Sequence, residues 1–81
     1  MPDNNDITRV DFWTVFRRGQ NGSLITNVPL RIGTSRFEED TTIDRGSLLG
    51  GIDFHKQIDR YLAVTITSSG LYIFRGVYLP E

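Results

Sequence analysis

The feature that most constrains the fold is a pair of β-branched and aromatic runs near the end of the chain. Residues 61–67 read YLAVTIT and residues 71–75 read LYIFR, with SSG at 68–70 between them. Such side chains suit a pleated, half-buried surface, and Ser and Gly favour tight turns. The pattern predicts a β-hairpin whose second strand bends or bulges at Gly76 and continues extended to Pro80.

A second hairpin is predicted near the start of the chain. Residues 10–18 (VDFWTVFRR) are rich in aromatic and β-branched residues, and the turn cluster GQNGS follows at 19–23. Asn-Gly tolerates the positive φ values of tight turns. Residues 24–32 then alternate as a second strand. Because Pro29 cannot donate a ladder hydrogen bond, this strand is predicted to be an edge or to bulge there.

The middle segment, residues 33–57, leaves two interpretations open. The apolar pair Leu48-Leu49 lies between glycines and is predicted to tuck beneath the domain as a plug. From Asp53 onward, helical spacing of Phe54 and Ile58 is compatible with a helix capped by Asp53. Extended or irregular structure is favoured over residues 53–60, because a helix there would end abruptly where the next strand begins.

These elements predict a mainly β fold, a small antiparallel barrel or roll of four to six strands with a long middle loop and possibly one short helix. Since halves of an 81-residue chain would fall near the roughly 40-residue limit for unaided folding, residues 7–81 are predicted to form a single small β domain. Residues 1–6 are predicted to be a flexible arm. With no secretory signal and no apolar run of about 20 residues, we expect a cytoplasmic protein without a membrane segment.

Both terminal segments carry apolar side chains on both faces of their predicted strands, which is unusual for an isolated antiparallel sheet. If the register holds through Gly76, Tyr72, Phe74 and Tyr78 share one face of the last strand. One core need not bury both apolar faces, and three alternatives remain for what covers the second one: the middle segment, a second protein chain, or a ligand or nucleic acid. Aromatic residues and arginine are enriched at protein interfaces. The predicted interaction residues are Trp13, Arg17, Arg18, Tyr72, Phe74, Arg75 and Tyr78.

The composition offers little support for catalysis. The chain has no cysteine and a net charge of −1, and no motif brings His55 to a serine nucleophile. We therefore expect no enzyme, no cofactor and no metal site. The favoured function is a noncatalytic protein-interaction module that self-associates, or binds another protein, through an aromatic strand face. The alternative is a small nucleic-acid-binding β-barrel, which is less favoured because the arginines are spread along the chain and matched by ten acidic residues.

Overall fold

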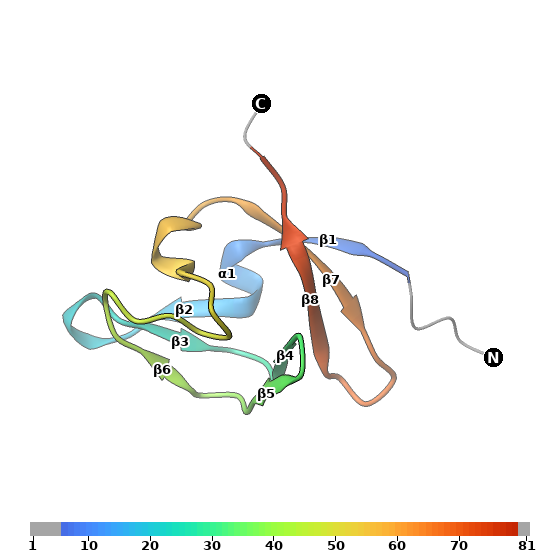
Figure 1. The fold of residues 1–81 in the computed structure, drawn as a ribbon, viewed down its shortest axis with the longest axis horizontal. Helices are drawn as coiled ribbons and strands as arrows, with labels where there is room; N and C mark the ends of the chain where they lie inside the picture. Colours follow the sequence, from blue (N-terminus) through green and yellow to red (C-terminus); the bar gives the residue numbers. More distant parts are fainter. Residues whose placement is uncertain (1–5, 80–81) are drawn as a thin grey trace.

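The structure is a computed structural model that describes residues 6–79, so nearly all of the predicted N-terminal arm lies outside the described residues. The fold is mainly β, as predicted, with three short helical turns (Figure 1). The elements in chain order are β1 (Thr8–Asp11), α1 (Phe12–Val15), β2 (Phe16–Arg18), η1 (Gln20–Gly22), β3 (Leu24–Thr26), β4 (Leu30–Ile32), β5 (Ser35–Phe37), β6 (Thr42–Ile43), η2 (Phe54–Lys56), β7 (Tyr61–Ile66) and β8 (Tyr72–Val77).

The strands form two separate sheets. One has five strands in the order β1-β7-β8-β4-β5, and the other has three in the order β2-β3-β6. Figure 1 shows the small sheet on one side of the molecule and β1, β7 and β8 on the other. Because the sheets are not closed on one another, a barrel or roll describes the fold only loosely. The eight strands in the described part of the chain also exceed the predicted four to six, since most are only two to four residues long.

The predicted first strand is wrong in its middle, where residues 12–15 form a helical turn. Asp11 caps this turn, its Oδ1 accepting the Trp13 N–H at 3.3 Å. The spacing of Phe12, Val15 and Phe16 is i, i+3 and i+4, which places all three on one side of a helix. All three are fully buried. The apparent two-sided apolarity of residues 10–18 therefore results from a helical period within a region that also suits a strand.

Asn27 closes the same helical turn from a distant part of the chain. Its N–H donates to the Val15 carbonyl at 2.7 Å, and its Nδ2 lies 3.1 Å from the Phe16 carbonyl and 3.3 Å from the Trp13 carbonyl. These bonds satisfy carbonyl groups that the end of a helix leaves without partners. The predicted strand 24–32 breaks here, so that Thr26 ends β3 in one sheet and Leu30 begins β4 in the other.

The C-terminal hairpin is confirmed as β7 and β8, and the pairing shifts register next to Gly76. Ala63 pairs with Gly76 whereas Val64 pairs with Phe74, which leaves Arg75 as an extra residue. The bulge changes which side chains share a face. Phe74 and Val77 both pack against the core. The predicted faces of the last strand are therefore wrong beyond Arg75.

The middle segment packs against the core, through a 3-10 turn rather than a helix or a strand. Asp53 caps η2 by accepting the His55 N–H at 3.1 Å. Phe54 is fully buried, with its ring centroid 4.9 Å from that of Phe16 and 5.3 Å from that of Phe74. Leu49 is buried as predicted for the plug, whereas Leu48 is exposed.

A buried hydroxyl fastens the loop after β5 to β3. Thr26 is fully buried, and its Oγ1 accepts the Thr41 N–H at 2.9 Å and donates to the Glu38 carbonyl at 3.0 Å. We expect Thr26→Val to lower the free energy of unfolding by about 1–3 kcal/mol, because it leaves the Thr41 N–H without this acceptor. Urea unfolding measures the change. The control is Thr42→Val in the exposed β6 position; equal effects of the two variants would contradict this role.

Candidate nucleic-acid interface

The seven predicted interaction residues do not form one surface. Tyr72 and Phe74 lie on the inner side of β8, where both pack against the core. Arg17 is bound within the fold, because its guanidinium donates to Asp40 at 2.7 Å and to Asn27 at 3.0 Å. The remaining four lie in two places: Trp13 in α1 with Arg18 at the end of β2, and Arg75 and Tyr78 along β8.

The outer side of the five-stranded sheet collects arginines that are far apart in the sequence. Arg31 lies between the buried residues Leu30 and Ile32, so it points away from the core. It pairs directly with Arg36 on β5. Arg31 also pairs with Ile73 on β8, which in turn pairs with Thr65 on β7. These pairings place the two arginines on the outer side of the sheet.

Two further arginines join this side from β1 and β8. Arg75, at the bulge, donates from Nε to the Thr65 hydroxyl at 3.0 Å, which holds it over the outer side of β7. Arg9 pairs with Ala63, next to the inward-facing pair of Val10 and Leu62. Four of the eight arginines in the chain therefore share one sheet side.

Two tyrosines complete the surface. The Tyr78 N–H donates to the Tyr61 carbonyl at 2.9 Å, which extends the hairpin by one pair. The Arg9 Cζ lies 4.1 Å from the ring centroid of Tyr61 and 5.3 Å from that of Tyr78. The tyrosine side chains remain 47% and 38% exposed. We call this surface the arginine–tyrosine face: Arg9, Arg31, Arg36, Arg75, Tyr61 and Tyr78.

The charge of the arginine–tyrosine face is little compensated. Within residues 6–79, Glu38 is the acidic partner of Arg36, at 3.4 Å, and both side chains are largely exposed. Exposed pairs of this kind contribute little to stability. Asp11, opposite Tyr61, is the acidic residue that the strand pairing places on this side. Like charges directly opposite one another on neighbouring strands, such as Arg31 and Arg36, are destabilising. The β4–β5 pairing therefore keeps two like charges side by side on this side of the sheet.

A second arginine–aromatic stack lies at the end of the β1–β7 pair. The Arg18 Cζ is 5.0 Å from the Trp13 ring centroid, and the indole N–H donates to Asp59 at 3.0 Å. Trp13 is two residues beyond Asp11, and Asp59 is two residues before Tyr61. The stack therefore lies where the chain leaves β1 and enters β7, the two strands that carry Arg9 and Tyr61 of the arginine–tyrosine face.

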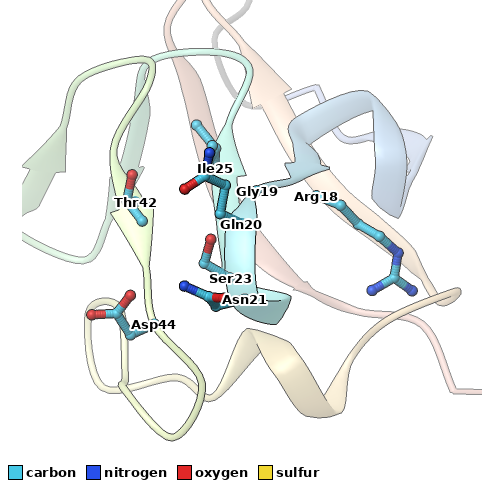
Figure 2. A pocket seen from close by; sticks show the side chains of 8 residues that line it. All are labelled: Arg18, Gly19, Gln20, Asn21, Ser23, Ile25, Thr42 and Asp44. Carbon is cyan, nitrogen blue, oxygen red and sulfur yellow. The ribbon is translucent and has the colours of Figure 1, made fainter.

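A polar hollow lies elsewhere, between the β2–β3 turn and β6. Figure 2 labels the residues that line the hollow and shows the Arg18 side chain extending away from the others. Asp44 lines the hollow as its acidic group, beside Asn21 and Ser23. The hollow is open to solvent, and its lining does not favour an anion, since the nearby arginine points elsewhere.

The other candidate chemistries gain no support from the geometry. His55 Nε2 lies 3.0 Å from the Ile43 carbonyl, so this ring nitrogen has a structural partner. In the part of the chain that the structure describes, no three acidic or histidine side chains gather in a way that could hold a metal ion. No helix of residues 6–79 is long and apolar enough to cross a membrane.

Comparisons with known proteins leave the geometry as the basis for a functional assignment. No protein-family model matches the chain, and neither the curated proteins nor the solved structures give a significant match. The sequence carries one signal for the arginine–tyrosine face, its eight arginines against one lysine. It did not show that distant arginines meet on one side of a sheet.

Proposed function

We propose that this protein is a noncatalytic binding module that holds a single-stranded nucleic acid on the arginine–tyrosine face. The observation that carries the proposal is the gathering of four arginines and two exposed tyrosines on one side of a sheet, in a chain whose net charge is −1. Arginine suits phosphate because its planar guanidinium offers several donors in a fixed geometry. Exposed aromatic rings on strands stack unpaired bases.

The contacts within the face fit this role. Arg9 lies over Tyr61 and, in the described part of the chain, takes no part in a hydrogen bond or ion pair. Arg31 has no such partner there either. The donors of both side chains are thus available to phosphate oxygens. Each tyrosine ring has a second face for a base, in keeping with the exposure of both rings.

Binding to a fluorescently labelled single strand tests the proposal. We expect oligo(dT) or oligo(U) to bind more tightly than a duplex of the same length, and affinity to fall as salt rises, because phosphate contacts release counterions. Anisotropy titrations at several salt concentrations measure both effects. Absence of binding at low salt, or affinity independent of salt, would rule the proposal out.

The tyrosines are expected to supply the stacking. Tyr61→Ala and Tyr78→Ala should each weaken binding of a single strand by about 1–3 kcal/mol, the usual effect of removing one base–aromatic stack. The same titration measures the loss. Ile66→Ala is the matched control, since Ile66 is 42% exposed on the same hairpin but pairs with the inward-facing Tyr72. If the control loses as much affinity as the tyrosine variants, stacking on this face is excluded.

A specific observation also favours self-association as a second function. Of the six exposed large apolar residues in the described chain, five belong to the N-terminal strand region and the C-terminal hairpin. These five are Ile7, Tyr61, Ile66, Tyr78 and Leu79. Exposed apolar groups that gather on one part of a small protein are typical of an interface.

A further inference from the structure

The free edge of β1 presents main-chain groups to a partner strand. β1 is the outermost strand of the five-stranded sheet, with β7 on one side only. The Tyr61 carbonyl accepts from β8, so its neighbour Leu62 directs its main-chain groups toward β1. Leu62 pairs with Val10. Val10 therefore uses its N–H and C=O toward β7, whereas the N–H and C=O of Arg9 and the N–H of Asp11 point outward from the sheet.

The side chains on this edge are complementary to themselves. Arg9 and Asp11 are two residues apart, so they lie on the same side of the strand with opposite charges. Neither forms an ion pair with another residue in the range 6–79. An antiparallel copy of the strand can place each charge opposite its counterpart, because two-fold symmetry reverses the order of the two residues.

We infer that a second copy of this chain pairs antiparallel with β1, with Val10 opposite Val10 at the two-fold axis. Arg9 of each copy then lies opposite Asp11 of the other, which makes two reciprocal ion pairs. The Asp11 N–H of each copy donates to the Arg9 carbonyl of the other. A register moved by one pair would place Arg9 opposite Arg9, which like-charge repulsion disfavours.

α1 sets the length of this contact. Asp11 caps α1, so its carbonyl group already accepts within the helical turn and the extended edge ends there. The contact is short, but it joins the two five-stranded sheets edge to edge and leaves their outer sides open. Two arginine–tyrosine faces would then lie on the same side of one continuous sheet, and Arg31, Arg36 and Arg75 of each copy would stay outside the edge contact.

Charge exchange across the edge tests this arrangement. Sedimentation of the wild type over a wide concentration range should show a monomer–dimer equilibrium. Arg9→Asp and Asp11→Arg should each weaken dimerisation by at least about tenfold, because both symmetry-related pairs become like-charged. The double variant R9D/D11R should restore it, since the pairs are rebuilt with reversed sign. Circular dichroism checks that each variant is folded.

The outcomes separate this inference from the proposed function. A wild type that stays monomeric, single variants that dimerise as well as the wild type, or a double variant that does not recover would each overturn the edge pairing. Nucleic-acid binding is measured separately on the wild type, because Arg9 also belongs to the arginine–tyrosine face and its substitution would change both properties. A monomer that binds a single strand refutes only the edge pairing, whereas a charge-dependent dimer that binds no single strand refutes only the proposed function.

Discussion

Phe54→Ala is expected to lower the free energy of unfolding by about 3–5 kcal/mol, the usual cost of removing a buried aromatic ring. Phe54 is fully buried, and its ring lies against Phe16 of the small sheet and against Phe74 of the large one. Native domains are stable by only about 5–15 kcal/mol. The loss should therefore leave a substantial unfolded population.

Urea unfolding followed by circular dichroism measures this effect. Leu48→Ala is the control, because Leu48 belongs to the same middle segment but is 59% exposed. Substitution there should change stability by no more than about 0.5 kcal/mol. Similar stability of the two variants would show that the middle segment does not seal the core, and that the surplus apolar faces need another cover.

Removing both arginines of the β4–β5 pair, R31A/R36A, is expected to weaken nucleic-acid binding and to stabilise the fold at the same time. The slope of log affinity against log salt should fall by about 1.4, since each phosphate contact on a single strand contributes about 0.7. The free energy of unfolding should rise by about 0.2–1 kcal/mol, because two like charges are directly opposite across the strands.

A decrease in affinity together with an increase in the free energy of unfolding distinguishes a functional role of these arginines from a structural one. Lys56→Ala removes an exposed positive charge from η2, which packs through Phe54 on the core side of β8 and away from the arginine–tyrosine face, and should leave the salt slope unchanged. A double arginine variant that is less stable, or that binds as tightly as the wild type, would show that Arg31 and Arg36 do not serve an anionic partner.

The two-sided apolarity of the sequence has a specific structural origin. Around Phe12 and Phe16, a helical turn brings Val15 to the same side, and along β8 the bulge at Arg75 brings Phe74 and Val77 together. Each feature adds a local break in the two-residue period. When side chains are assigned to faces by strict two-residue alternation across such a break, core residues are distributed over both faces of the strand. The sequence therefore suggested a larger apolar surface outside the core than the structure has.

Local preferences in the sequence were sufficient for the C-terminal hairpin, the β2–β3 turn and the mainly β class. Turn residues and β-branched runs act within a few positions along the chain, so their effect can be predicted without a tertiary structure. The helical turn at residues 12–15 could not be predicted this way. Its carbonyl groups depend on Asn27, which approaches only when the chain folds back.

The arginine–tyrosine face was likewise decided by tertiary structure. The four arginines of this face, at positions 9, 31, 36 and 75, are separated by up to 66 positions (75 − 9) in the sequence. The chain as a whole has nine Lys and Arg against ten Asp and Glu, so the sequence shows no basic cluster. Strand order and register bring them to one side of a sheet. The sequence by itself determined the C-terminal hairpin and the charges; pairing between distant strands decided which charges became neighbours, because side-chain direction depends on register.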